Sequence, residues 1–468
     1  MSDNDIRHAG FKDRVRVASA REALREVVTP HGQTDRLAVG AADGRVLAES
    51  IVADRNVPHY ARAAMDGYAV RAADTFGASD RSPQYLVRSE TGDPGAAVRV
   101  HTGSVLPDGT DAVVMIEQVE EVGTAGETVG TEAEAVGTEA ETVGTEIEVY
   151  DAVTEGENVG AVGEDIEAGR PLFEPGHRLR PSDIGLLRST GVDEVSVASR
   201  PQVAVIPTGE ELVEEDPEPG EIVETNGLTV SQYVRRWGGD PTYREIVTDD
   251  EDALREAIQR DLTSDVVVTT GGSSVGERDL VPAVVADLGE VFVHGVALKP
   301  GHPVALGVVE GTPVIMLPGY PVACIVNAVQ FLRPTTAWLL GAPVVDHPTV
   351  SARLSRKIRS EPGVRTFVRV SLERNGDAVP GEDVHSGDVV QTGGDTEPRD
   401  DGEHVDSVEF GDDAEHGSEA WVATPTRASG SGVLSSVALA DGWVEVPESR
   451  DGIPDGETVS VKFWEWSP

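Results

Sequence analysis

Asp265-Val-Val-Val-Thr-Thr-Gly-Gly-Ser-Ser-Val-Gly-Glu-Arg-Asp279 is the stretch of sequence that decides the fold. Its first part, Val266 to Thr270, is a short run of β-branched residues, which is typical of a buried parallel strand. The run ends at Gly271 and Gly272, where the lack of side chains lets an anionic ligand approach the backbone N–H groups. The hydroxyls that follow can cap a helix or bind a phosphate oxygen. The stretch therefore predicts an anion-binding loop, with a tight strand-to-helix turn as the alternative.

This loop matches neither common phosphate-binding fingerprint. Gly271 and Gly276 have the spacing of P-loop glycines, but Glu277 and Arg278 stand where a lysine and a hydroxyl residue are required. The Gly-x-Gly-x-x-Gly pattern of dinucleotide-binding domains is not present either. The sequence predicts an anion site of another kind.

Alternating strand and helix patterns surround the loop. Strands are expected near residues 203–206, 243–247, 266–270, 291–297, 304–308 and 313–317. Helices are expected near residues 226–237, around Leu254, Ile258 and Leu262, and near 280–288 and 321–340. Such alternation predicts a doubly wound parallel sheet, whose ligands bind beyond the carboxyl ends of the strands. Four polar turns, at 208–211, 248–250, 271–274 and 318–321, are expected at those ends.

The composition of the 468 residues limits the possible classes of protein. No window approaches the ~20 apolar residues of a transmembrane helix, and the first residues lack the pattern of a signal peptide. Cys324 is the only cysteine, which excludes an internal disulfide and a cysteine zinc site. The sequence therefore predicts a cytoplasmic protein of two to four domains with no membrane partner.

The net charge of −45 is spread over the whole chain. Residues 118–150 hold nine acidic residues and residues 377–419 hold fifteen, and the remainder is also acidic. Only four lysines occur among 38 basic residues. This profile resembles proteins of a salt-rich cytoplasm, where a Debye length of ~3 Å at ~1 M salt screens self-repulsion. Nucleic acid is excluded as a partner because its binding needs a cationic surface.

Both acidic segments look like insertions. A seven-residue unit that begins Val-Gly-Thr repeats over residues 119–149, and its regular glycines favour a hairpin tip or loop over a coiled coil. The Asp/Gly-rich segment 377–419 is expected to be a long acidic loop or a disordered insert.

Seven motifs in order resemble one family. They are Ala64-Met65-Asp66-Gly67-Tyr68, Thr102-Gly103 with Leu106-Pro107-Asp108-Gly109, Val162-Gly163-Glu164-Asp165, Thr208-Gly209-Glu210-Glu211, the glycine loop 271–279, Lys299-Pro300-Gly301-His302-Pro303 and Leu317-Pro318-Gly319-Tyr320-Pro321. Together they resemble molybdopterin molybdenumtransferase, the family that includes the E domain of gephyrin. The resemblance covers nearly the whole chain and fails only at the two acidic insertions.

The resemblance implies a multidomain α+β and α/β protein with four domains in each subunit of a homodimer. We expect a discontinuous N-terminal domain from 1–50 and 151–199, and a β domain inserted at 51–150. We expect the α/β molybdopterin-binding domain at 200–343 and a β-rich C-terminal domain at 344–468.

The resemblance also implies the substrates and the reaction. Molybdate is inserted into adenylylated molybdopterin with Mg²⁺, AMP is released, and the active site is shared between subunits. The implied catalytic residues are Asp66, Glu211, Asp249, Asp279 and Lys299, of which Glu211, Asp249 and Asp279 could hold the metal ion. The implied substrate-binding residues are Thr102, Asp165, Thr208, Gly271, Gly272, Ser273, Ser274, Gly276, Pro318, Gly319, Pro321 and Ser431. Contact with a molybdopterin adenylyltransferase is a further implied partnership.

Two departures from the family concern the oxyanion. Gly295 and His302 stand where family members often carry lysines, so this chain has fewer cations there, and tungstate instead of molybdate stays open. Two other functions also stay open: molybdopterin adenylyltransferase, and a non-catalytic scaffold of the gephyrin type.

Overall fold

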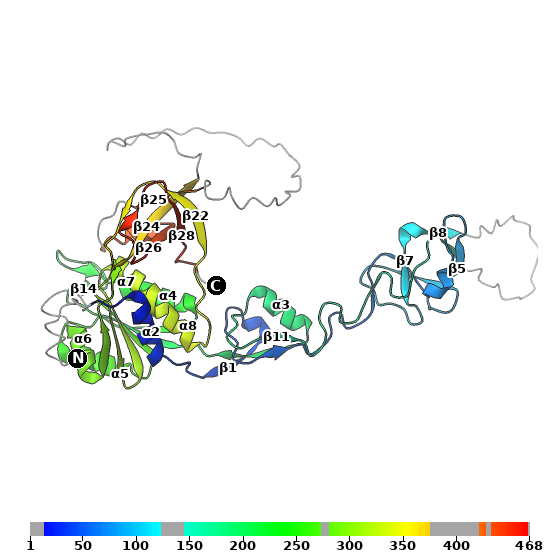
Figure 1. Cartoon of the computed structure of the whole chain (residues 1–468). Helices are drawn as coiled ribbons and strands as arrows, with labels where there is room; N and C mark the ends of the chain where they lie inside the picture. The colour runs from blue at the N-terminus through cyan, green and yellow to red at the C-terminus, as the bar shows by residue number, and fades with distance from the viewer. Residues whose placement is uncertain (1–13, 123–144, 273–279, 375–420, 427–431, 467–468) are drawn as a thin grey trace, which may run out of the picture. The chain divides into compact units, whose positions relative to one another are not determined.

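The computed structural model describes residues 14–122, 145–272, 280–374, 421–426 and 432–466 (Figure 1). The chain divides into two compact units. One combines Met1–Gln33 with Ala198–Pro468, and the other is Thr34–Val197. Across the described residues, we find no helix with the length and apolarity needed to cross a bilayer.

A six-stranded sheet forms the centre of the first unit. Its strand order is β16-β13-β17-β21-β20-β18. These strands are β13 (Gln202–Pro207), β16 (Asp240–Tyr243), β17 (Val266–Thr270), β18 (Glu290–His294), β20 (Ala305–Val309) and β21 (Thr312–Leu317). The pairs among β16, β13, β17 and β21 are parallel, whereas β20 is antiparallel to both of its neighbours.

The predicted doubly wound α/β class is confirmed, but the sheet is parallel over four strands only. Glu310 and Gly311 join β20 to β21, with positive φ angles of 50° and 88°. A two-residue turn of this kind can only join antiparallel strands, because a parallel connection needs a long crossover. The short turn therefore fixes the direction of β20.

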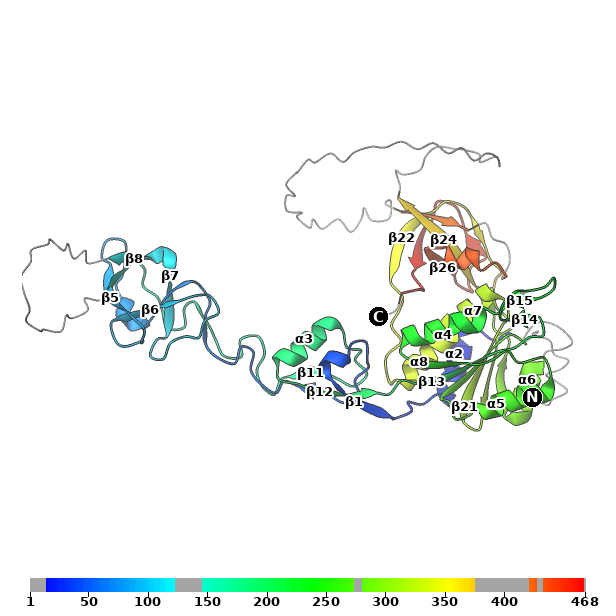
Figure 2. The same ribbon diagram turned by 180° about the vertical axis from the view of Figure 1, so that it is seen from behind.

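Helices cover both faces of this sheet (Figures 1 and 2). One face carries α2 (Val17–Val27), α4 (Asn226–Trp237), α7 (Pro321–Asn327), the π-helical turn η4 (Ala328–Leu332) and α8 (Arg333–Leu339). The other face carries α5 (Glu251–Arg260) and α6 (Leu280–Leu288). Alternate residues of the strands supply the two cores: Val203 and Val205 join the first, and Ala204 and Ile206 join the second.

Helix α2 belongs to the core of this α/β region. Val17, Ala20 and Leu24 are fully buried in the first core, beside residues of α4 and α8. The sequence interpretation assigned residues 1–50 to the N-terminal domain. The structure differs because the apolar face of α2 finds its partners in the α/β region.

The helix expected over 321–340 is interrupted by η4. Pro334 lies in the first turn of α8 and has no N–H to donate to the carbonyl of Gln330, four residues earlier. That carbonyl instead accepts a hydrogen bond from Arg21 Nε of α2 at 2.8 Å, and Arg21 Nη2 donates to Gln330 Oε1 at 2.6 Å. The missing donor thus explains both the local widening of the helix and its link to α2.

A second six-stranded sheet follows, with the order β19-β24-β25-β22-β28-β26. The strands are β19 (Leu298–Lys299), β22 (Thr349–Leu354), β24 (Arg365–Arg374), β25 (Trp421–Pro425), β26 (Gly442–Val446) and β28 (Thr458–Lys462). An additional pairing of β24 with β26 closes the sheet on itself. The short strands β23 (Ile358–Arg359) and β27 (Gly452–Ile453) pair beside it, and α9 (Ser435–Ala438) precedes β26.

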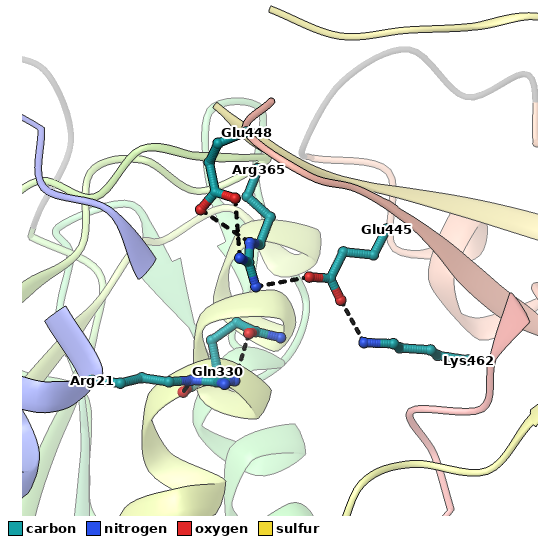
Figure 3. A network of polar contacts seen from close by, with 6 residues as sticks. All are labelled: Arg21, Gln330, Arg365, Glu445, Glu448 and Lys462. Carbon is teal, nitrogen blue, oxygen red and sulfur yellow. Dashed lines mark hydrogen bonds and ion pairs between the residues drawn. The ribbon is translucent and has the colours of Figure 1, made fainter. Parts of the chain in front are cut away.

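Apolar contacts join the two sheets within this unit, and ion pairs fix the geometry of the second sheet itself. Trp443 and Trp464 stack with ring centroids 4.7 Å apart, and both belong to the core that α4 and α8 share. Arg365 makes paired hydrogen bonds to Glu448 at 3.0 and 3.1 Å (Figure 3). Since the pairing is bidentate and partly buried, it fixes the geometry better than an exposed ion pair would.

The second unit is built mostly from short strands. Its largest sheet has the order β7-β4-β6-β5-β9-β8. The strands are β4 (Gly67–Val70), β5 (Gln84–Ser89), β6 (Ala96–Val100), β7 (Ala112–Met115), β8 (Val119–Val122) and β9 (Glu146–Val149). Strands β8 and β9 are antiparallel, with Val122 paired to Glu146. The predicted hairpin tip between them lies outside the described residues, as does the insertion at 377–419.

The remaining elements of this unit are small. They are β1 (Thr34–Ala38) paired with β12 (Glu194–Ala198), β2 (Ile51–Val52) with β11 (Pro171–Phe173), β3 (Arg62–Ala63) with β10 (Val159–Gly160), helix α3 (Pro181–Ser189), and the 3₁₀ turns η1 (Val39–Ala41), η2 (Ala72–Thr75) and η3 (Ile116–Gln118). In the first unit, β14 (Leu212–Val213) and β15 (Ile222–Val223) form one further pair.

Candidate functional site

The candidate site lies at the topological switch point of the parallel sheet, where the order of the strands reverses. After β13 the chain builds β16 on one side, and it then crosses to build β17 on the other side. The connections leaving β13 and β17 therefore diverge, and in open α/β sheets ligands bind at such a point, in a crevice beyond the carboxyl ends of the strands. Thr208 follows β13, and Gly271 follows β17.

Three turns meet at this edge because glycines allow a close approach. A Cβ atom on Gly271 would lie 2.1 Å from the carbonyl oxygen of Thr208, and φ at Gly271 is 127°. The Cβ position of Gly319, in the turn after β21, is 3.5 Å from Gly271 Cα. The Gly271 N–H donates to the Leu317 carbonyl at 3.0 Å. The turns after β13, β17 and β21 thus form one compact floor, which we call the glycine cradle (residues 208, 271–272 and 318–319).

Three buried threonine hydroxyls lie at or next to the ends of β13 and β17. The Oγ1 atoms of Thr208, Thr269 and Thr270 are inaccessible to solvent and have no hydrogen-bond partner among the described residues. Thr270 is the last residue of β17, and Thr208 directly follows β13. A buried hydroxyl without a partner costs about 1–3 kcal/mol, so the arrangement favours an acceptor that supplies the missing bonds.

A second set of polar residues supports the cradle from helix α4. Asn226 Nδ2 donates to the Gly319 carbonyl at 2.6 Å. Glu224, only 7% exposed, accepts from Gly227 N at 2.7 Å and from the Tyr243 hydroxyl at 2.5 Å. Burial, followed by the hydrogen bond to Glu224, raises the pKa of Tyr243. Sequence reasoning did not select these residues, although a Glu-Thr-Asn run opening a helix after a strand was a usable signal.

Glu211 and Asp249 lie in the turns that follow the neighbouring strands β13 and β16. Thr208 bridges Val247 in parallel, and the Gly209 N–H donates to the Val247 carbonyl at 3.1 Å. Glu211 lies two residues after Gly209, and Asp249 lies two residues after Val247. Asp279 lies outside the described residues, and within the described ranges no group of three potential metal ligands is found.

Lys299, the predicted anchor for an anion, lies on the short strand β19 (Leu298–Lys299). Strand β19 pairs in parallel with β24, so Lys299 sits at the edge of the C-terminal sheet. Its Nζ lies 3.1 Å from Glu361 Oε1, and both side chains are largely exposed. Burial lowers the pKa of His302 below its ordinary value, and the charges of Arg14 and Lys299 lower it further, while Glu361 opposes them. The cation expected to anchor an anion therefore already has an anionic neighbour.

Asp66 and Thr102 come together in the second unit. The Asp66 Oδ1 atom accepts hydrogen bonds from Thr102 N at 2.7 Å and from Thr102 Oγ1 at 2.8 Å. These two bonds, the backbone one first, lower the pKa of Asp66 below its ordinary value. Asp165 lies elsewhere in this unit and lines an open hollow of about 510 Å³ together with residues 163–164 and 167–170. The structure brings the first pair together and does not place Asp165 in contact with it.

The other predicted residues divide into two groups. Pro318 and Pro321 flank the turn after β21, and Gly272 continues the cradle, with its Cβ position 3.0 Å from Thr208 Oγ1. Ser273, Ser274, Gly276 and Ser431 lie outside the described residues.

The fold and the cradle define a class of protein. It is an α/β domain with glycine turns at the carboxyl ends of its parallel strands, preceded in the sequence by a largely β unit and followed by a β-rich domain. Residues 204–338 match a region described as "probable molybdopterin binding domain". Residues 15–191 match the MoeA N-terminal region (domain I and II), and residues 414–464 match the MoeA C-terminal region (domain IV).

Relatives in the curated proteins agree with these matches. A Methanocaldococcus jannaschii protein whose name assigns it to molybdopterin biosynthesis is 31% identical over 454 residues, which cover 94% of each chain. The molybdopterin molybdenumtransferase of Bacillus subtilis is 34% identical over 277 residues, and that of Staphylococcus epidermidis is 31% identical over 274. The chain matches only about three fifths of the length of these two enzymes, 59% and 60%.

Solved structures share the fold over nearly the whole chain. A crystal structure of the molybdopterin biosynthesis MoeA protein of Pyrococcus horikoshii has a TM-score of 0.71 at 30% identity, covering 97% of this chain and 99% of that one. A second crystal structure of a molybdopterin biosynthesis MoeA protein, from Pyrococcus horikoshii OT3, has a TM-score of 0.73 at 27% identity, covering 96% of this chain and 100% of that one. This chain belongs to the MoeA family, and the resemblance inferred from its motifs is confirmed.

Proposed function

We propose that this chain is a molybdopterin molybdenumtransferase, which inserts molybdate into adenylylated molybdopterin and releases AMP in molybdenum cofactor biosynthesis. The observation that carries the proposal is the glycine cradle. It lies within the stretch that matches a molybdopterin binding domain, and its buried threonine hydroxyls lack acceptors among the described residues. Phosphate oxygens of the substrate would supply those acceptors.

The chain's residues would bind and orient the substrate at this edge of the sheet. Thr208 and Thr270 donate hydrogen bonds to phosphate oxygens, and the missing side chains of Gly271 and Gly272 let the phosphates approach the backbone. Ser273, Ser274 and Gly276 extend this contact by the resemblance. Pro318, Gly319 and Pro321 form the wall of the crevice, with Gly319 held by Asn226. Holding the reacting groups in place supplies much of the rate gain in such transfers.

A magnesium ion fits the donor set of the strand-end carboxylates. Glu211 and Asp249 provide hard oxygen ligands from neighbouring turns, and we propose that Asp279 joins them. When bound, Mg²⁺ neutralises phosphate charge and so favours the departure of AMP. The carboxylates themselves have a second role, because they keep anions away from the site when no cation is present.

Lys299 is proposed to attract molybdate. An ammonium group is a strongly hydrated point charge that suits a small tetrahedral anion. Glu361 competes for this cation at 3.1 Å, and Gly295 and His302 add no fixed positive charge nearby. We therefore propose that oxyanion binding is weak and depends on ionic strength. Tungstate is the natural competitor to test.

We also propose that the chain forms a homodimer in which Asp66, Thr102 and Asp165 of one subunit serve the cradle of the other, with Ser431 contributing from the C-terminal domain. Mixing inactive Asp66→Ala with inactive Asp249→Ala subunits tests this directly. Half of the subunits would then form mixed dimers with one intact site, which restores about a quarter of the wild-type activity. Complete inactivity of the mixture would contradict the shared site.

One assay separates the proposed activity from its alternatives. The full chain is given adenylylated molybdopterin, Mg²⁺ and molybdate at ~1 M salt, where its charges are screened, and AMP release is followed. Molybdate-dependent release supports insertion, and Asp279→Ala is expected to abolish it without unfolding the protein. Adenylylation of free molybdopterin from ATP would indicate an adenylyltransferase instead. Inactivity in both reactions would favour a scaffold of the gephyrin type.

The acidic composition supports two further proposals about the setting. We propose a cytoplasm rich in salt, so activity and the unfolding midpoint are both expected to rise from dilute buffer to ~1 M salt. We also propose that a molybdopterin adenylyltransferase contacts this chain to deliver the adenylylated substrate. Co-sedimentation of the two enzymes tests the contact.

A further inference from the structure

Tyr320 is an exposed aromatic residue at the rim of the glycine cradle. It occupies the turn after β21, between Gly319 and Pro321, and 59% of its surface is exposed. A tyrosine normally buries most of its ring, so a large exposed ring beside a ligand crevice calls for an explanation. The proposed phosphate contacts do not use this side chain.

The backbone that carries the ring is held in place on both sides. Asn226 Nδ2 donates to the carbonyl of Gly319 at 2.6 Å, and the Tyr320 carbonyl accepts from Cys324 N at 2.8 Å. Gly319 in turn packs against Gly271 of the cradle. Only the two side-chain torsions of Tyr320 are left free. Ordering this ring on a ligand therefore costs little conformational entropy.

Gly432 of the C-terminal domain lies close to the ring and has no side chain. A Cβ atom on Gly432 would lie 3.5 Å from Tyr320 Cδ1 and 3.8 Å from Cε1. A larger residue at this position would cover part of the ring. Leu228, from the helix whose Asn226 holds the turn, is also exposed. The ring thus keeps an open apolar surface next to a site built for phosphates.

We propose that Tyr320 stacks against a planar heteroaromatic ring of the substrate while the cradle holds the adjoining phosphate. This inference rests on the proposed function, since adenylylated molybdopterin carries both an adenine and a pterin ring. An offset stack on a fixed tyrosine provides affinity for a ring and none for a bare phosphate. Tyr320 would then be a residue that determines specificity in addition to the phosphate contacts.

The test compares ring ligands with a phosphate ligand on the full chain. Dissociation constants of AMP, a soluble free pterin and inorganic pyrophosphate are measured for the wild type, Tyr320→Ala and Tyr320→Phe. We expect Tyr320→Ala to weaken binding of one of the two ring ligands about tenfold. Tyr320→Phe is expected to retain it, and pyrophosphate binding is expected to stay the same. The ring that loses affinity identifies the stacking partner.

A matched control and an independent readout keep the result interpretable. Tyr85 is 58% exposed in the other unit, so Tyr85→Ala removes a similarly exposed ring and is expected to change none of the three constants. The proposal is overturned if Tyr320→Ala binds AMP and the free pterin as tightly as the wild type does. It is also overturned if the wild type binds neither ring ligand. An equal loss of pyrophosphate binding also overturns it, because the turn and not the ring would be responsible. AMP release by the wild type is measured separately, so failure of the proposed function remains distinguishable.

Discussion

Replacing Gly271 with alanine is expected to destabilise the first unit strongly. Two terms contribute. The φ angle of 127° is unfavourable for any residue with a Cβ atom and costs about 1–3 kcal/mol. The new Cβ would also lie 2.1 Å from the Thr208 carbonyl oxygen, and relieving such an overlap costs about 1–3 kcal/mol more. The sum, about 4 kcal/mol, is a large part of a domain's stability of about 5–15 kcal/mol.

Gly311 offers a matched control for the backbone term. Its φ angle is 88°, but a Cβ atom there would meet nothing within 4 Å. Gly311→Ala therefore carries the conformational cost without the overlap, about 1–2 kcal/mol. The difference between the two variants isolates the close approach between the ends of β13 and β17.

Tryptophan fluorescence during urea unfolding is a suitable assay. All six tryptophans lie in residues 198–468, so the signal reports the first unit and not Thr34–Val197. We expect Gly271→Ala to lose about 2–3 kcal/mol more than Gly311→Ala, and to lose pyrophosphate binding as well. Equal losses in the two variants would refute the reasoning, since they would mean that the strand ends can move apart freely.

Three further predictions concern ionisable groups. Although burial opposes it, hydrogen bonds from its arginine and histidine neighbours lower the pKa of Asp183 to about 2. The ionised carboxylate therefore stabilises the folded state above the unfolded-state pKa of about 3.9, and this contribution is lost as the pH falls towards 2. In urea unfolding, Asp183→Asn should lower the free energy of unfolding by about 2 kcal/mol at neutral pH and by progressively less in acid. Glu361→Gln removes the anionic partner of Lys299 in an exposed ion pair. The affinity for molybdate should then rise a few-fold in dilute buffer and equal that of the wild type at ~1 M salt. An equal gain in affinity at high salt would contradict this reasoning. Thr102→Val removes one of the two hydrogen bonds that Asp66 accepts from Thr102. The pKa of the Asp66 carboxyl, followed by NMR titration, should then rise partway to its ordinary value. An unchanged pKa would show that the side-chain hydrogen bond does not contribute.

Local signals were enough to predict most of the α/β region. Helix α4 (Asn226–Trp237) and strand β17 (Val266–Thr270) have the predicted bounds, because a capped apolar pattern and a β-branched run are short-range features. Asp250 caps α5 by accepting from Ala253 N at 2.9 Å, as its place in the Thr-Asp-Asp turn indicated. The connection at Glu310–Gly311 was short enough to indicate a hairpin, and the parallel prediction overlooked it.

Contacts between distant segments could not be predicted in this way. The hydrogen bond between the buried Glu224 and the exposed Tyr243 depends on β16 lying beside β13, and no local pattern marks either residue as a partner of the other. Lys299 was selected as an anchor for an anion, and only backbone pairing with β24 shows that it lies on the C-terminal sheet beside Glu361. The sequence also could not predict that α2 packs on the α/β sheet, because an amphipathic helix does not specify which apolar surface it contacts.

The sequence by itself determined the class of fold, the family and the residue types available for phosphate and metal binding. These follow from periodicity, turn chemistry and the order of the motifs, all of which are properties of a linear chain. Only the tertiary structure decided that Thr208 meets Gly271 and that the turn carrying Tyr320 packs against them. The reason is physical. Parallel pairing brings together strand ends that are far apart in the sequence, and only glycines permit the contact at the distances found.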